Sequence, residues 1–316
     1  MGQLKIIHGN SNPELAIEIA KELGEEVCET KVSRFPDGEV YIHIRETVRG
    51  KHVYIIQPVS PPVNESLMEL LLMIDALKRA SAKRIAAVIP YYGYARQDRK
   101  QTGRVPISAK LVANMISTAG ADRILTLDLH SGQIQGFFDI PVDNLRSDPI
   151  FADYYSKYQD KLDEAVVVSP DVGGAKRARK LAQKLNLPLA IVEKKRDPEN
   201  KKAKVMNLIG DVRGRKCFIV DDLISTGGTL VKVSQELKNR GASHIEAICT
   251  HGLFAGEALN KLEKSPIKSI TVTNTIRHEE ARKSDFVNYI SVGNLFANTI
   301  KRIYHKKSVS KLFPHS

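Results

Sequence analysis

The segment that decides the fold reads Cys217-Phe-Ile-Val-Asp-Asp-Leu-Ile-Ser-Thr-Gly-Gly-Thr229. A short apolar run ends in two carboxylates, Asp221 and Asp222, and a loop of small residues follows. After the loop, apolar side chains recur at helical spacing from Leu230 to Leu237. The pattern therefore predicts a strand, a loop and the first turns of a helix, in that order.

The loop consists of Ser225, Thr226, Gly227, Gly228 and Thr229, and it suits a phosphate group. Glycines let backbone N–H groups approach an anion, and the start of a helix favours negative charge. The acid pair sits where the strand ends, at the edge where open α/β sheets bind ligands, and could accept hydrogen bonds from vicinal ribose hydroxyls. The alternative, an ordinary strand-to-helix turn with acidic caps, leaves the Gly-Gly pair between two threonines unexplained.

This stretch resembles the phosphoribosyl-diphosphate binding motif of the type I phosphoribosyltransferase fold. The resemblance does not name a reaction, because transferases that consume phosphoribosyl diphosphate carry the motif and so does the enzyme that makes it.

Length and composition indicate a protein with a large core. The 316 residues suffice for two domains, and the hydrophobic content of 42% argues against disorder. Cys28, Cys217 and Cys249 lack metal-ligand spacing and are typical of a reducing compartment. No apolar run is long enough to span a bilayer, and the first residues lack a signal-peptide pattern. We therefore expect a cytoplasmic protein.

The formal net charge of +12 leaves two interpretations open. One is nucleic-acid binding, although the basic residues are dispersed and no nucleic-acid motif accompanies them. The other, which we favour, is a basic surface that steers polyanionic substrates such as ATP and sugar phosphates.

The sequence contains an internal repeat. Ala76–Ile89 parallels Glu236–Cys249, and the parallel extends to Tyr94 and Phe254. Each block ends a predicted helix and enters a predicted strand. Further strands are expected around them, at Val53–Ile56, Ile124–Leu129, Phe218–Val220 and Ile270–Thr273.

Alternating strands and helices predict an α/β protein of two similar type I phosphoribosyltransferase-like domains, each with a mainly parallel central sheet flanked by helices. The expected domains are 1–146, on the ATP side, and 147–316, with the sugar phosphate site. In the first half Gln57, Pro61 and Pro62 stand where the second half has acids and glycines. Proline lacks an N–H donor, so only the second domain should hold the sugar phosphate.

Four other segments carry polar side chains in unusual density. Phe35–Glu39 places an aromatic ring before a turn and two carboxylates, although a simple Pro-Asp-Gly turn explains it equally well. Tyr94–Arg104 is rich in guanidinium groups that could clamp a polyphosphate or form a solvated face.

The remaining two segments end predicted strands. His130 follows a strand, with Asp128 expected on the same strand face, so a metal or phosphate role competes with a structural one. Asp171 precedes two glycines and is a candidate Mg²⁺ ligand, while the strand from Leu189 ends in consecutive cations.

Taken together, these segments are similar to the ribose-phosphate diphosphokinase family over essentially the whole chain. The segment Asp128–Phe138 carries the most specific resemblance. The family transfers the diphosphoryl group of MgATP to the anomeric hydroxyl of ribose 5-phosphate, for nucleotide biosynthesis, so the resemblance implies that activity and Mg²⁺ as cofactor.

The resemblance also implies roles by position. The ATP site would use Phe35, Asp37, Gly38, Glu39, Arg96 and Gln97, with the first four contributed across a subunit interface. The catalytic residues would be Lys194, Arg196 and His130. The Mg²⁺ ligands would be His130 and Asp171. The ribose 5-phosphate site would use Arg196, Asp221, Asp222 and the loop from Ser225 to Thr229.

Family members form homo-oligomers, usually hexamers, and many are activated by phosphate and inhibited by ADP. The positions that match this regulatory site are Arg49, Gln135, Asp143, Asn144, Ser308 and Ser310. Ser225 departs from the family, since many members have Asp there, and Gln101–Gly103 differs from the more basic loop of regulated members. These departures bear on subclass and regulation.

Two other functions remain as alternatives. A base phosphoribosyltransferase would explain the glycine loop but would leave Phe35–Glu39 and Arg96–Lys100 without a role. A non-catalytic homologue should have lost some active positions, whereas His130, Asp171 and Lys194 are all present.

Overall fold

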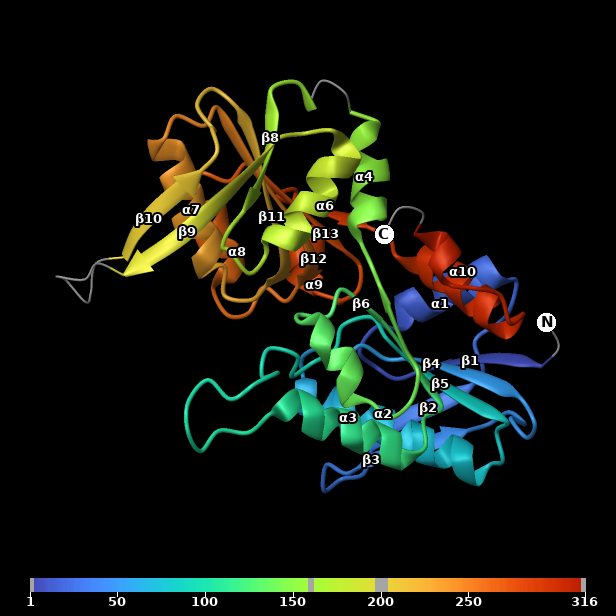
Figure 1. The fold of residues 1–316 in the computed structure, drawn as a ribbon. Helices are drawn as coiled ribbons and strands as arrows, with labels where there is room; N and C mark the ends of the chain where they lie inside the picture. The colour runs from blue at the N-terminus through green and yellow to red at the C-terminus, as the bar shows by residue number, and fades with distance from the viewer. Residues whose placement is uncertain (1–2, 159–161, 197–203, 314–316) are drawn as a thin grey trace. The chain divides into compact units, whose positions relative to one another are not determined.

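The computed structural model describes residues 3–158, 162–196 and 204–313, and its chain divides into two compact units (Figure 1). The first unit comprises Met1–Arg146, Thr275–Arg277 and Ser291–Ser316, and the second comprises Ser147–Asn274 and His278–Ile290. Side chains of residues 194–196 and 204–206 lie outside the description.

The C-terminal end of the chain differs from the expected second domain, 147–316. Helix α10 (Gly293–Tyr304) packs in the first unit on α1 (Pro13–Leu23), where Asn294 Nδ2 donates to Glu22 Oε2 at 3.1 Å. An amphipathic pattern shows that one face of a helix is buried, but it does not say which partner buries it.

The first unit is built on a five-stranded parallel sheet of order β1-β4-β5-β6-β7, with a separate antiparallel hairpin, β2–β3. Its elements, besides α1 and α10, are β1 (Leu4–His8), β2 (Thr30–Arg34), β3 (Val40–Ile44), β4 (His52–Ile56), α2 (Val63–Arg79), β5 (Arg84–Ile89), α3 (Ser108–Ala119), β6 (Arg123–Leu127), η1 (Gly132–Phe137), β7 (Val142–Leu145) and η2 (Ser310–Leu312).

The second unit has a seven-stranded sheet of order β10-β9-β8-β11-β12-β13-β14, parallel except for β10. Its elements are α4 (Asp148–Ser156), β8 (Ala165–Ser169), α6 (Ala175–Leu185), β9 (Leu189–Arg196), β10 (Lys204–Ile209), β11 (Lys216–Ile224), α7 (Gly228–Asn239), β12 (His244–Gly252), α8 (Ala258–Glu263), β13 (Ser269–Thr273), α9 (Glu279–Lys283) and β14 (Val287–Ile290). The two mainly parallel sheets with their helices confirm the predicted fold class.

The internal repeat corresponds to the same structure in each unit. The run β4–α2–β5 of the first unit matches β11–α7–β12 of the second. Equivalent positions even share the left-handed backbone: φ is 61° at Ser81 and 88° at Gly241, and 65° at Tyr94 and 45° at Phe254. Since residues other than glycine rarely adopt positive φ, the shared conformation shows that the repeat extends into the loops.

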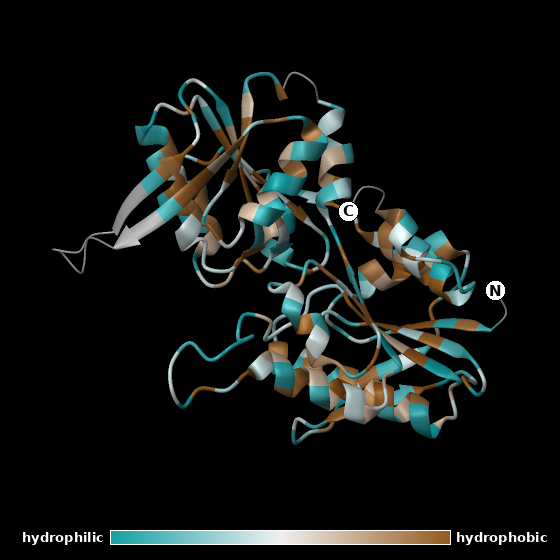
Figure 2. Ribbon diagram, in the orientation of Figure 1, coloured by the Kyte–Doolittle hydropathy of each residue, from teal (hydrophilic) through white to brown (hydrophobic). Residues whose placement is uncertain are grey.

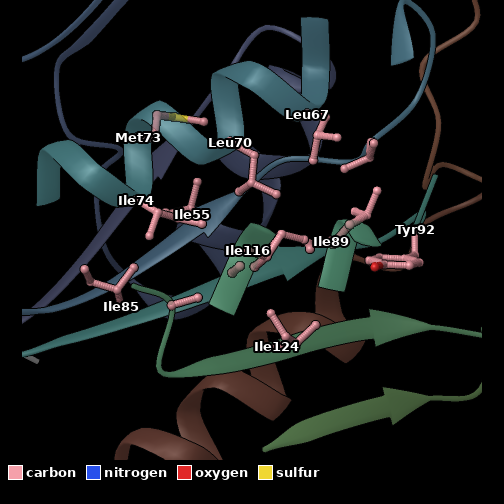
Figure 3. Close-up of a cluster of buried hydrophobic side chains, with 14 of the residues drawn as sticks. Ile55, Leu67, Leu70, Met73, Ile74, Ile85, Ile89, Tyr92, Ile116 and Ile124 are labelled. Carbon is pink, nitrogen blue, oxygen red and sulfur yellow. The ribbon is translucent and has the colours of Figure 1, made fainter. Parts of the chain in front are cut away.

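Each sheet lies at the centre of its own core. Hydrophobic residues concentrate along the strands, and hydrophilic residues on the outer sides of the helices (Figure 2). In the first unit α2 turns Leu70, Met73 and Ile74, all fully buried, toward Ile55 and Ile85 of the sheet (Figure 3). Fully burying one such side chain contributes about 1.5–3 kcal/mol. The near-continuous apolar strands reflect a parallel sheet that is buried on both faces.

Candidate active site

The acid pair lies within strand β11 of the second unit. The strand was expected to end at Val220, but it continues to Ile224, so both acids belong to it. Asp222 is buried and Asp221 is half-buried. Arg177 of α6 reaches across to both, with its Nη1 atom 3.1 Å from Asp222 Oδ1 and 3.6 Å from Asp221 Oδ1.

The two carboxylates influence each other's charge. Burial and the neighbouring charge of Asp222 raise the pKa of Asp221 to about 7, whereas Arg177 acts to lower it. The sequence analysis missed Arg177. The sequence feature that could have indicated it is an arginine in the first turn of a predicted helix. The helix dipole disfavours a cation at that end unless acids lie nearby.

The loop after β11 leads into the start of helix α7. Helix α7 is 12 residues long and begins at Gly228, and its first N–H groups have no partner within the helix. The loop itself is fixed, because Ala255 N donates to the Ser225 carbonyl at 3.0 Å. The arrangement suits an anion of the size of phosphate.

Glycine is required at position 227 for two reasons. The residue has φ of +73°, and a Cβ built on it would lie 3.0 Å from Cγ of Leu262, a fully buried side chain. Both conditions fix the path by which the chain enters α7.

We predict that Gly227→Ala raises KM for a bound sugar phosphate about tenfold or more, because small displacements of positioning groups have large effects. The left-handed backbone should add a stability loss of about 1–2 kcal/mol. Steady-state kinetics and thermal denaturation measure both. Gly256→Ala is the control, since φ is +56° there but nothing lies within 4 Å of the added Cβ. It should lower Tm and leave KM unchanged. An equal rise in KM in both variants would contradict the assignment.

Asp171 lies in the loop between β8 and α6. Its Oδ1 atom accepts from Gly174 N at 2.8 Å, and its carbonyl accepts from Ser169 Oγ at 2.7 Å. The carboxylate is thus held at the start of the same helix that carries Arg177.

The first unit fills the position that corresponds to the acid pair. Gln57, which is fully buried, donates from Nε2 to Glu69 Oε2 at 3.0 Å and accepts from Ser11 Oγ at 2.8 Å. A Cβ on Gly9 would lie 2.5 Å from Gln57 Oε1, so the side chain fits closely. Because α2 follows Pro62 rather than a glycine, this end offers no cradle for phosphate.

The predicted adenine-binding residues occupy the turn of the β2–β3 hairpin. Phe35 is 48% exposed and packs edge-on against Tyr41 with ring centroids 5.2 Å apart. Gly38 has φ of 96° and donates to the Phe35 carbonyl at 2.9 Å, while Asp37 Oδ1 accepts from Glu39 N at 3.1 Å. The Pro-Asp-Gly turn is therefore present, and it holds an exposed aromatic ring available for stacking.

Arg96 and Gln97 are exposed in the loop between β5 and α3, which projects from the first unit (Figure 1). The Gln97 carbonyl accepts from Ala109 N at 3.2 Å, and its side chain accepts from the Ser108 hydroxyl. These two hydrogen bonds hold Gln97, the chain neighbour of Arg96, at the start of α3.

The expectation for His130 needs a correction. Strand β6 ends at Leu127, because Asp128 adopts a left-handed φ of 42°, so Asp128 and His130 do not share a strand face. His130 is exposed. Its segment is tied to β7, since Leu129 N donates to Asn144 Oδ1 at 3.1 Å.

Lys194 and Arg196 lie in β9, opposite Met206 and Lys204 of the antiparallel β10. Their side chains, and residues 197–203, lie outside the described residues.

Metal ligands are few in the described part of the chain, which contains no group of three or more His, Cys, Asp or Glu side chains arranged for a metal ion. Mg²⁺ often takes only one or two protein carboxylates and completes its shell with water and substrate phosphates. The Asp171 carboxylate fits this use as an oxygen donor, whereas the imidazole of His130 is a less typical Mg²⁺ ligand.

Only three of the six residues predicted for the regulatory site line a common cavity. Asp143, Ser308 and Ser310 line a cavity of about 700 Å³ in the first unit, which Arg84 and Lys307 also line. The other three are not among its lining residues. Arg49 donates to Ser81 Oγ at 3.2 Å, Gln135 donates to the Gly132 carbonyl at 3.0 Å, and Asn144 holds Leu129.

An acid pair near the end of a strand, followed by a glycine loop and the start of a helix on a mainly parallel sheet, is typical of the class of phosphosugar-binding α/β proteins. Comparison with known families narrows the class further. Residues 4–120 match the model of the N-terminal domain of ribose phosphate pyrophosphokinase, and residues 196–314 match the phosphoribosyl synthetase-associated domain.

Individual relatives agree with the family models. The chain is 52% identical to a ribose-phosphate pyrophosphokinase of Fusobacterium nucleatum, over 98% of each protein. It is 54% identical to one of Caldanaerobacter subterraneus, again over 98% of each. A crystal structure of phosphoribosylpyrophosphate synthetase from Mycobacterium smegmatis superposes with a TM-score of 0.90 at 41% identity, covering 96% of this chain and 99% of that one.

This chain belongs to the ribose-phosphate pyrophosphokinase family and is an enzyme, a diphosphotransferase. No helix in the described ranges has the length and apolar character needed to cross a membrane.

Proposed function

We propose that the enzyme transfers the β,γ-diphosphoryl group of MgATP to the anomeric hydroxyl of ribose 5-phosphate, giving 5-phosphoribosyl 1-diphosphate and AMP. The observation that carries the proposal is the Asp221–Asp222 pair near the end of β11, on the strand that leads through the loop from Ser225 into the start of α7. Near full-length identity of 52–54% to proteins named ribose-phosphate pyrophosphokinase supports the same reaction.

The sugar binds in the second unit. The carboxylates of Asp221 and Asp222 accept hydrogen bonds from the two ribose hydroxyls, and the backbone N–H groups of Ser225–Thr229 hold the 5-phosphate. This leaves the anomeric oxygen as the hydroxyl that faces the diphosphoryl donor. In the first unit the Gln57 side chain fills the position that corresponds to the acid pair, so the sugar phosphate does not bind there and we assign this unit to ATP.

The ATP-binding residues are Phe35, Asp37, Gly38, Glu39, Arg96 and Gln97, in which the Phe35 ring stacks on adenine and the Arg96 guanidinium pairs with phosphate. The anomeric oxygen attacks the β-phosphorus, and the bond from that phosphorus to the α,β-bridging oxygen breaks. Lys194 and Arg196 neutralise charge on the transferring group, and this reaction depends on positioning and charge more than on covalent catalysis.

Mg²⁺ is the proposed cofactor, and when bound it neutralises phosphate charge. Asp171 would hold it through a carboxylate oxygen, with His130 near the nucleotide complex. The donor chemistry of Asp171 supports this, because hard cations prefer oxygen ligands.

The enzyme assembles as a homo-oligomer, proposed to be a hexamer, in which the hairpin turn completes the ATP site of a neighbouring subunit. The exposure of Phe35 at the tip of the hairpin supports a contact outside its own unit. The six regulatory residues are the proposed phosphate and ADP site, and the support is limited to Asp143, Ser308 and Ser310, which line a cavity together with cationic side chains. Three buried free cysteines agree with a cytoplasmic location.

The shared ATP site predicts complementation between inactive chains. Asp37→Ala removes the hairpin's contribution, and Lys194→Ala removes the catalytic cation, so neither variant alone should turn over. Mixed oligomers contain some sites that are intact in both respects, and partial activity should return. The measurement is turnover after mixing, with subunit exchange verified by native mass spectrometry. No recovery in verified mixed oligomers would indicate that one chain builds the whole site.

The proposed reaction is tested by incubating the purified enzyme with ATP, ribose 5-phosphate and Mg²⁺ without any nucleobase. AMP and 5-phosphoribosyl 1-diphosphate should form in equal amounts, and chelation of the metal should stop the reaction. Formation of ADP instead of AMP, or a requirement for a base, would reject it. Repeating the assay with phosphate and with ADP, beside a mass measurement, tests regulation and assembly.

A further inference from the structure

Arg177 forms ion pairs with both members of the acid pair, and it lies at an unusual position for a cation. It lies in the first turn of α6, where the helix dipole disfavours positive charge. Its side chain is only 22% exposed, and one nitrogen, Nη1, lies within 4 Å of both Asp221 and Asp222.

We propose that Arg177 is a positioning residue for the sugar, because it bridges the two carboxylates and holds them oriented to accept the ribose hydroxyls. The proposal rests on the sugar site proposed above and adds a residue to it.

The geometry around the pair supports this role. The side chain of Asp222 is 7% exposed, and its backbone N–H donates to Asp221 Oδ1 at 2.9 Å. Two carboxylates this close repel, and without a cation one of them tends to take up a proton. A protonated carboxyl is a neutral and weaker acceptor, so the hydrogen bond that it accepts from a sugar hydroxyl would be weaker.

Arg177 also connects two loops of the site. Its helix starts directly after Gly174, which donates to the Asp171 carboxylate at 2.8 Å. The bridge from Arg177 to β11 therefore ties the loop of the proposed metal ligand to the strand that carries the sugar-binding acids.

The groups that act on Asp221 define the expected pH dependence. They are Arg177 from α6, Asp222 on its own strand and the Cys249 thiol of the neighbouring β12. Burial raises the pKa of that thiol, so it stays neutral. Two groups lower the pKa of Asp221, the Arg177 charge and the backbone N–H of Asp222, and removal of the Arg177 charge should move that pKa above about 7. Because the sugar needs the ionised form of Asp221, binding weakens as the pH falls through the pKa of this carboxyl. In a variant that lacks the Arg177 charge this pKa is higher, so the weakening should begin at a higher pH than in the wild type.

The test compares Arg177→Gln with Arg179→Gln, which removes the same charge from an exposed position on the same helix. Arg177→Gln should raise KM for ribose 5-phosphate about ten- to hundredfold near neutral pH, with a much smaller change for ATP. The ratio of its KM to that of the wild type should shrink as the pH rises to about 9, where Asp221 ionises without help. Arg179→Gln should match the wild type throughout.

A conservative variant separates charge from packing. Arg177→Lys keeps the charge but not the planar fork, so it should restore the wild-type pH profile and leave KM moderately raised. If Arg177→Gln fails to fold, the test compares Arg177→Lys with Arg179→Lys. A higher KM for ribose 5-phosphate in Arg177→Lys supports the proposed bridge between the two carboxylates. Equal KM values for the two variants at every pH overturn the proposal.

Two outcomes would overturn the proposal when Arg177→Gln folds. One is a sugar KM equal to that of Arg179→Gln, and the other is a raised KM whose ratio to wild type does not change with pH. An error in the proposed location of the sugar site would give a different result. In that case Asp222→Asn would also leave KM for ribose 5-phosphate unchanged.

Discussion

Lys194→Ala should lower kcat by on the order of 10²–10³, while both KM values change only a few-fold. The proposed contact of the ammonium group is with charge that develops on the transferring diphosphoryl group. An interaction made only in the transition state raises kcat without tightening ground-state binding. Steady-state kinetics with ATP and ribose 5-phosphate varied in turn measures all three constants.

Lys195→Ala is the matched control for this prediction. Both lysines lie in strand β9, and neighbouring positions of a strand alternate between its two faces. The substitution at Lys195 removes the same side chain and should cost much less. If it is the more damaging of the two, the catalytic assignment in this strand is wrong.

Asp222→Asn should raise KM for ribose 5-phosphate about ten- to hundredfold, because a hydrogen bond to a charged group contributes about 1.5–3 kcal/mol. The substitution preserves the shape of the side chain, so the ATP constants should change little. It also removes a charge that raises the pKa of Asp221, so the sugar KM of the variant should depend less on pH below about 7 than that of the wild type.

The control for charge removal is Asp211→Asn, an exposed acid of the second unit whose Oδ1 accepts from Arg213 N at 3.1 Å. Kinetics of this variant should match the wild type. A sugar KM unchanged by Asp222→Asn would contradict the role assigned to the acid pair.

The fold could be predicted because its decisive features are local. The strand, glycine loop and helix between Cys217 and Leu237 follow from residue types at fixed spacing, and the internal repeat then extends the prediction to the first unit. Gly227 in particular is recognisable, since it belongs to a Gly-Gly pair between two threonines, and its left-handed φ of +73° agrees with a need for glycine.

What the sequence could not supply depends on contacts between distant segments. Arg177 contacts the acid pair because α6 packs beside β11, whose acids lie 44 and 45 positions further along the chain (221 − 177 and 222 − 177), and sequence spacing does not predict contacts at that separation. Likewise, α10 packs on α1 at the other end of the chain, which extended the first unit beyond the predicted boundary. The left-handed turn at Asp128 also had no signal, because aspartate adopts it only occasionally.

The central claim is that the second unit binds the sugar phosphate through Asp221, Asp222 and the start of α7. The most direct measurement is a crystal structure of the enzyme soaked with ribose 5-phosphate. The account predicts phosphate density at the backbone N–H groups of residues 225–229 and ribose hydroxyls on the two carboxylates. Sugar density beside Gln57 of the first unit, with the β11–α7 loop empty, would contradict it.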